Sequence, residues 1–112
     1  MADKLTQLRK GVLEFAVLAL LEQSSRYGVE IIENLNQYPG LSTKAGTIYP
    51  LLTRLKTLGL VTTSWQESPV GPPRKYYALS HTGKKRYHEM KHEWSQLVAD
   101  MASVMCKPDH DS

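Results

Sequence analysis

The sequence predicts a mainly α (α+β) fold in which residues 1–80 form one small domain and residues 81–106 form a long C-terminal helix. Two observations predict the domain: apolar residues recur at helical spacing before residue 60, and strand-like segments then flank a proline-rich turn. A third observation, a helical apolar seam over residues 87–104, predicts the final helix. The tail over residues 107–112 has no core-forming residue, so we expect it to be disordered.

The first predicted helix has apolar residues on two sides. One stripe consists of Leu5, Leu8, Val12, Phe15, Ala16 and Ala19, and further apolar residues (Leu13, Val17, Leu18, Leu20 and Leu21) surround its second half. Such a helix needs cover on two sides, and its own domain supplies only one. A chain of 112 residues forms only a modest hydrophobic core, so we expect a second copy of the chain to cover the other apolar side of this helix.

A second helix is predicted from Tyr27 to Leu35, and a third between Thr47 and Leu58. Ser24 or Ser25 could cap the second helix, which ends by Pro39, and a short turn over residues 41–43 could cap the third. The buried side of the second helix is predicted to be Ile31, Ile32 and Leu35, and that of the third Ile48, Leu51, Leu52, Leu55 and Leu58. Two helices joined by a polar turn match a helix-turn-helix unit, whose second helix enters the major groove.

Pro50 leaves the start of the third helix open. If the helix begins near Gly46, the proline falls in its first turn and costs little. If it begins at Lys44, a break in the helical hydrogen bonds is expected.

A hairpin is predicted directly after the third helix. Gly59 suits the left-handed residue that ends a helix, and residues 60–66 and 74–80 are rich in β-branched and aromatic residues. Three prolines among residues 68–73 cannot donate backbone hydrogen bonds and predict a stiff tip. A helix-turn-helix followed by such a wing is a winged helix-turn-helix.

Charge is concentrated in the region proposed to meet nucleic acid. The chain has a net charge of +3 and a pI near 9.0, but residues 41–79 alone carry five basic residues against one acidic residue. The single Cys106 excludes an internal disulfide, and with no signal peptide recognised we expect a reducing cytosol. The apolar run over residues 12–21 is too short to cross a membrane.

Several motifs occur together in a characteristic order: LRKGVLE (8–14), LALL (18–21), YGVEI (27–31), GTIYPLLTRL (46–55), LGLV (58–61) and RKYYALSHTG (74–83). On these motifs the chain resembles the PadR family of transcriptional regulators over about residues 8–105, and its length is similar to the short subfamily. The resemblance implies a prokaryotic, cytoplasmic, nucleoid-associated homodimer that needs no cofactor. It also implies repression of transcription until an effector, such as a phenolic acid or a cationic lipophilic drug, releases the DNA. The chain departs from the family in the wing tip at residues 70–73, which is less glycine-rich and less basic.

Eight residues are candidates for DNA contact. Thr47, Tyr49 and Thr53 on the outer face of the third helix could meet base edges and methyl groups, whereas Tyr27, Lys44, Arg54, Arg74 and Lys75 could meet phosphates. Arg54 is expected to lie between Tyr49 and the wing. A dimer would set two third helices into successive major grooves, about 34 Å apart, on an inverted-repeat operator. The alternative is a winged-helix module for protein contact, because a fold alone does not determine function.

The C-terminal helix is predicted to form the dimer. At about 1.5 Å per residue it is too long to be buried on a small domain, and the predicted interface consists of Leu5, Leu8, Val12, Tyr87, Met90, Trp94, Leu97 and Met101. Trp94 has two interpretations: a core residue at the dimer centre, which we favour, or a plate on which a flat effector stacks. In the second case Phe15, Met90 and Trp94 would line the effector pocket.

A possible zinc motif is present but incomplete. His88-Glu89-Met90-Lys91-His92 matches H-E-x-x-H, in which two histidines one turn apart bind zinc. A catalytic site also needs a third protein ligand and a cleft, and Met90 belongs to the apolar seam. We therefore expect neither a metal site nor an enzyme.

Overall fold

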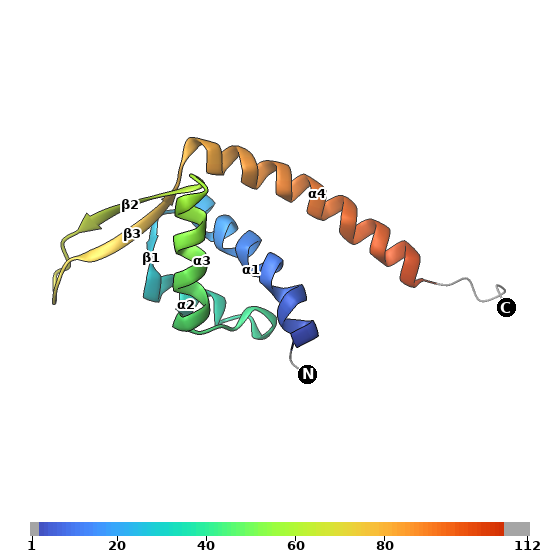
Figure 1. The fold of residues 1–112 in the computed structure, drawn as a ribbon, viewed down its shortest axis with the longest axis horizontal. Helices are drawn as coiled ribbons and strands as arrows, with labels where there is room; N and C mark the ends of the chain where they lie inside the picture. The colour runs from blue at the N-terminus through green and yellow to red at the C-terminus, as the bar shows by residue number, and fades with distance from the viewer. Residues whose placement is uncertain (1–2, 107–112) are drawn as a thin grey trace.

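The computed structural model describes the backbone of residues 3–106 and the side-chain surroundings of residues 8–106. The predicted tail over residues 107–112 therefore lies outside the described residues. The elements in chain order are α1 (Asp3–Gln23), β1 (Arg26–Tyr27), α2 (Gly28–Leu35), a 3-10 turn (Pro39–Leu41), α3 (Ala45–Thr57), β2 (Val61–Gln66), β3 (Arg74–Leu79) and α4 (His81–Met105). This order confirms the predicted winged helix-turn-helix, from which α4 projects as a long rod (Figure 1).

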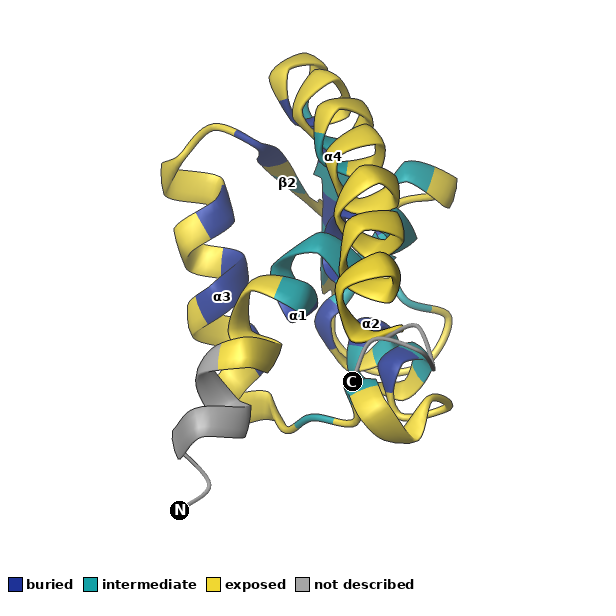
Figure 2. Ribbon diagram, turned by 90° about the vertical axis from the view of Figure 1, so that its right-hand side faces the viewer, coloured by how far each residue is buried: buried dark blue, intermediate teal, exposed yellow. Residues whose placement is uncertain are grey.

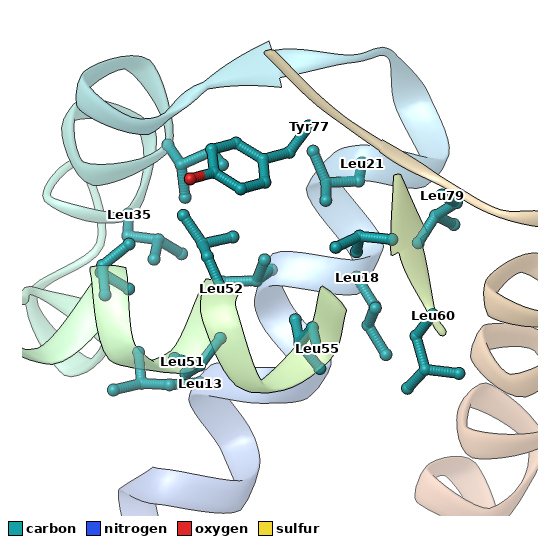
Figure 3. Packing of buried hydrophobic residues seen from close by; sticks show 14 residues of the cluster. Leu13, Leu18, Leu21, Leu35, Leu51, Leu52, Leu55, Leu60, Tyr77 and Leu79 are labelled. Carbon is teal, nitrogen blue, oxygen red and sulfur yellow. The ribbon is translucent and has the colours of Figure 1, made fainter. Parts of the chain in front are cut away.

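The core lies where α1, α2 and α3 meet the sheet. Its buried residues are Leu13, Val17, Leu18 and Leu21 of α1, Ile31 and Leu35 of α2, Ile48, Leu51, Leu52 and Leu55 of α3, and Leu60, Val61, Tyr77 and Leu79 around the sheet (Figure 3). α1 contributes through four positions at helical spacing, so its opposite side is left outside the core. Among residues 3–106, no helix is both long and apolar enough to cross a lipid bilayer.

The sheet has three antiparallel strands in the order β1-β3-β2, so the predicted two-stranded hairpin was incomplete. Arg26 pairs with Tyr77, and Tyr27 pairs with Tyr76. Tyr27 is therefore a strand residue that caps α2, not part of the helix, and no serine supplies the predicted cap. A strand of two residues is too short to have a composition signal of its own.

α3 begins at Ala45, which places Pro50 inside the helix. The carbonyl of Gly46 therefore lacks its usual donor four residues later, in agreement with the second of the two alternatives. The N-cap is Lys44, whose side chain makes no capping hydrogen bond. Leu58 was wrongly predicted to be buried: it follows the helix as its C-cap and is 53% exposed.

Gly59 turns the chain from α3 into β2. Its φ is +78°, the left-handed conformation that glycine adopts without strain. The amide of Gly59 donates to the carbonyl of Lys56 (2.9 Å), and the amide of Leu60 donates to that of Leu55 (3.0 Å). These two bonds form a Schellman motif and satisfy carbonyls at the end of the helix.

Ser80 fastens the start of α4 to the end of α3. Its hydroxyl oxygen accepts a hydrogen bond from the amide of Gly83 (2.9 Å), and its hydroxyl donates to the carbonyl of Gly59 (2.6 Å). Ser80 was predicted to belong to the second wing strand, but it is the N-cap of α4. The helix consequently begins at His81 and leaves the domain from a fixed point.

α4 has two halves with different surroundings. Tyr87 and Met90 are partly buried against the core of their own domain. From Trp94 onward, the apolar residues of the predicted seam are exposed (Figure 2): Trp94, Leu97, Met101 and Val104. The continuous intermolecular seam predicted from the heptad spacing is therefore interrupted, because its first two members already pack within the protomer.

Candidate nucleic-acid interface

The outer face of α3 is polar and exposed along its whole length. Thr47, Thr53 and Lys56 are exposed, and Tyr49 is 39% exposed. The hydroxyl of Thr53 donates to the carbonyl of Tyr49 (3.0 Å), which fixes its orientation but leaves its oxygen free to accept. All three predicted base-reading residues are thus accessible, but they do not share one side of the helix. Tyr49 and Thr53 lie one turn apart on one side of α3, whereas Thr47 lies on the side toward α1, where it lines a cleft.

Tyr49 also packs against the domain. A Cβ atom added to Gly28 would lie 2.5 Å from the ring carbon Cε1 and from the hydroxyl oxygen of Tyr49, so the missing side chain of Gly28 makes room for the ring. The phenol of Tyr77 is nearby: burial raises its pKa above the ordinary value, and Tyr49 adds a smaller electrostatic contribution in the same direction. The ring of Tyr49 therefore packs against α2 at Gly28, near Tyr77 of the sheet.

We expect Gly28→Ala to displace Tyr49 and to destabilise the fold by about 1–3 kcal/mol, the usual cost of overpacking. In a Tyr49→Ala background the same substitution should cost almost nothing, because the clashing ring is gone. Urea denaturation of the four proteins in this cycle would measure the coupling. Gly46→Ala is the matched control, since a Cβ there meets nothing within 4 Å. Equal costs of Gly28→Ala in the two backgrounds would contradict this contact.

The wing brings two predicted phosphate ligands together on one face of the sheet. The guanidinium carbon of Arg74 lies 4.4 Å from the centroid of the Tyr27 ring, and Tyr27 meets Tyr76 edge to face at 5.4 Å. Lys75 is on the opposite face, beside the exposed Trp65 with which it is paired in register. The stack of Arg74 on Tyr27 depends on β1, so sequence reasoning could not find it.

Arg54 lies against α1, not between Tyr49 and the wing as predicted. Its guanidinium forms an ion pair with the carboxylate of Glu14. The side chain of Arg54 is 55% exposed and that of Glu14 is 19% exposed. Arg54 is thus accessible to a phosphate but already has a partner of opposite charge.

A cleft of about 470 Å³ lies between α1, α3 and the turn that precedes α3. Four of its lining residues are basic (Arg9, Lys10, Lys44 and Arg54), one is acidic (Glu14), and Leu13, Pro50 and Leu51 form its apolar wall. Arg9 donates a hydrogen bond to the carbonyl of Ser42 (2.7 Å). Sequence reasoning assigned this part of α1 to dimerisation alone. The signal it missed was the adjacent pair of cations at residues 9 and 10.

The residues predicted for dimerisation and for an effector are arranged along α1 and α4. Leu8 is 68% exposed, Val12 is half-buried, and the side chain of Leu5 lies outside the described residues. The ring of Phe15 lies 5.8 Å from Tyr87 and 5.8 Å from Trp94, centroid to centroid. Phe15 and Trp94 are thus brought together within one protomer, whereas Met90 packs on the core.

His88 of the possible zinc motif faces α1. Its Nε2 atom lies 3.5 Å from a carboxylate oxygen of Glu22. Over the part of the chain that the structure describes, no group of three or more histidine, cysteine, aspartate or glutamate residues is arranged to hold a metal ion.

The fold, the exposed polar face of α3 and the cations beside it are those of a winged helix-turn-helix DNA-binding protein. Residues 17–89 match the transcriptional regulator PadR-like family, and the chain belongs to that family. It is therefore a DNA-binding transcriptional regulator and not an enzyme.

Solved structures resemble the chain over most of its length. A PadR-like transcriptional regulator from Bacillus cereus is 31% identical with a TM-score of 0.83, and the match covers 91% of this chain and 99% of that one. A PadR-like transcription factor from Bacteroides fragilis is 39% identical with a TM-score of 0.76, covering 88% and 95%. Bacillus subtilis PadR, solved in complex with operator DNA, is 30% identical with a TM-score of 0.64, covering 70% of this chain and 46% of that one.

Proposed function

We propose that this protein is a cytoplasmic, homodimeric transcriptional repressor that binds an inverted-repeat operator and leaves it when a small aromatic or lipophilic effector binds. The observation that carries the proposal is the exposed outer surface of α3, where Tyr49 and Thr53 lie one turn apart and Thr47 is accessible at the edge toward α1. Hydroxyl groups and an aromatic edge can contact base edges and thymine methyl groups in the major groove. Bacillus subtilis PadR, to which the chain is similar, has been solved in complex with operator DNA, which supports operator binding by this fold.

The exposed second half of α4 supports the homodimer. Leu97 is 56% exposed, Met101 47% and Val104 74%, and they follow one another at helical spacing. A second α4, together with the free side of α1, would cover them. Twofold symmetry then places the two α3 helices so that each reads one half-site.

The aromatic cluster of Phe15, Tyr87 and Trp94 supports an effector site between α1 and α4. Trp94 is 42% exposed, so a flat molecule could stack on its free face. Release of the DNA requires the effector to bind better to a dimer whose two α3 helices are not correctly spaced for the operator. A phenolic acid or a cationic lipophilic compound would suit such a site.

The test is a mobility-shift assay with the DNA upstream of the protein's own reading frame, after footprinting has located the two half-sites. We expect the wild-type protein to shift this duplex in the presence of excess random DNA. Inserting about five base pairs between the half-sites turns one to the opposite side of the duplex and should abolish specific binding. Equal binding to both duplexes would contradict the dimeric mechanism. A complete lack of binding at low salt would favour a protein-contact module instead.

A further inference from the structure

The cleft between α1 and α3 has a net positive charge. Its four basic residues face a single carboxylate, that of Glu14. Lys10 is exposed at the cleft, and Lys44 stands at the N-terminus of α3. We propose that this cleft is a second DNA-backbone site, in which Lys10 and Arg9 of α1 bind phosphates on the side of α3 away from the wing. The proposal rests on the insertion of α3 into the major groove.

The shape of DNA requires contacts on both sides of an inserted helix. The major groove is about 12 Å wide and is bordered by a phosphate strand on each side. α3 lies between the wing and α1 (Figure 1), so the wing can reach only one of those strands. Arg74, stacked on Tyr27, would serve the strand beside the wing, and the basic residues of the cleft would serve the other. Phosphate contacts on both sides would fix the orientation of α3.

The turn that precedes α3 is held in place for this role. Arg9 donates to the carbonyl of Ser42, and the side-chain oxygen of Asn36 accepts from the amide of Thr43 (2.8 Å) and the hydroxyl of Ser42 (3.0 Å). These bonds join α1 and α2 to the start of α3. Lys44 makes no side-chain cap, so the first amides of α3 add donors that favour an anion.

Glu14 acts as a positioning residue and limits the affinity of the site. Its carboxylate, mostly buried, holds the guanidinium of Arg54 at the edge of the cleft. The same negative charge repels a phosphate in the cleft. Removing it while keeping its shape should therefore strengthen DNA binding, although an ion pair is lost.

An organic anion is the rival occupant, because Leu13, Pro50 and Leu51 give the cleft an apolar wall. The observations favour the DNA backbone. Lys44 belongs both to the cleft and to the start of α3, so a duplex bound on α3 would pass the mouth of the cleft. The several cations of the cleft would then meet several phosphates of the duplex, whereas an organic anion would bring only one carboxylate.

The decisive measurement is the salt dependence of binding by Lys10→Gln, with Lys91→Gln on the exposed side of α4 as the matched control. Affinity for the footprinted operator and for a random duplex would be measured between 50 and 200 mM salt. Loss of one phosphate contact makes the slope of log affinity against log salt less steep by about 0.9. The ratio of wild-type affinity to Lys10→Gln affinity should therefore fall about 3.5-fold between the lowest and the highest salt concentration. Lys91→Gln should match wild type. Both duplexes should weaken alike, because phosphate contacts carry no sequence information.

Two further variants separate charge from structure. For Arg9→Lys, the slope of log affinity against log salt should be close to that of wild type. For Arg9→Gln, the slope should be less steep by about as much as for Lys10→Gln. Glu14→Gln should bind either duplex about twofold more tightly, the effect of one unit charge about 10 Å away in water. Thermal unfolding and sedimentation of each variant would verify that fold and oligomeric state match those of wild type.

An unchanged slope for a folded Lys10→Gln would overturn the inference, and so would a loss confined to the operator. Benzoate at constant ionic strength provides the remaining arm. If it binds wild type but not Lys10→Gln, while the salt slope of DNA binding is the same for both proteins, the cleft is an organic-anion site and the inference is again overturned. Failure of the wild-type protein to bind any duplex would instead overturn the proposed function.

Discussion

Gly83→Ala is expected to lower the free energy of unfolding by about 3 kcal/mol or more, the upper range for overpacking. A Cβ at this position would lie 2.9 Å from the carbonyl carbon of Leu60 and closer still to its oxygen. Both neighbours are backbone atoms, which cannot rotate away as a side chain could. The same carbonyl accepts a hydrogen bond from the amide of Ser80 (3.0 Å), so any shift also disturbs the cap of α4.

Urea denaturation followed by circular dichroism would measure this loss, with Gly11→Ala as the matched control. Gly11 is inside α1, and a Cβ there meets nothing within 4 Å. Because alanine favours helix more than glycine does, the control should be more stable than wild type by about 0.5–1 kcal/mol. Similar stabilities for the two variants would show that α4 does not start against Leu60.

Leu97→Glu is expected to separate the proposed dimer and to weaken operator binding by about a hundredfold or more. Leu97 is exposed in the middle of the free half of α4, where a partner helix would bury it. A carboxylate buried at an apolar interface without a partner is strongly unfavourable. Separated subunits lose the gain in affinity from two linked half-sites, typically between a hundredfold and ten-thousandfold.

Sedimentation velocity at micromolar concentration would measure the separation, and a mobility shift would measure the affinity. Ser95→Glu adds the same charge two residues away, on a different side of α4, and should leave both unchanged. If Leu97→Glu stayed dimeric and bound the operator normally, the second half of α4 would not be the dimer interface.

Local patterns in the sequence were sufficient to predict most of the fold. Helical spacing located the buried face of α3 and showed that α1 is apolar on two sides, and Gly59 marked the turn into the wing, with the positive φ that this turn requires. The outer face of α3 followed from the same spacing, because the residues between buried positions must point outward. The errors in predicting the elements occurred where a segment was very short or where a residue lay at the end of a helix. β1 has two residues, and Leu58 lies just beyond the last turn of α3.

The candidate site could be predicted only in part, because its geometry depends on residues far apart in the chain. The pairing of Arg54 with Glu14 spans 40 residues, and no periodic pattern reports which cation will face which acid. The same holds for Tyr49 over Gly28, which requires α2 to pack on α3, and for Arg74 over Tyr27, which requires β1 to pair with β3. The basic cleft was missed for this reason, since Arg9 and Lys10 approach Lys44 only once α1 and α3 are packed.

The sequence by itself determined the class of fold, the order of its elements and which face of each helix is apolar, since these follow from spacing within a few residues. Only the tertiary structure decided that Tyr87 and Met90 pack within their own protomer while Leu97 and Met101 remain free. A heptad pattern specifies a stripe on a helix but not what covers it. That depends on how far the domain extends along α4, and the packing of α1 sets this limit near Trp94.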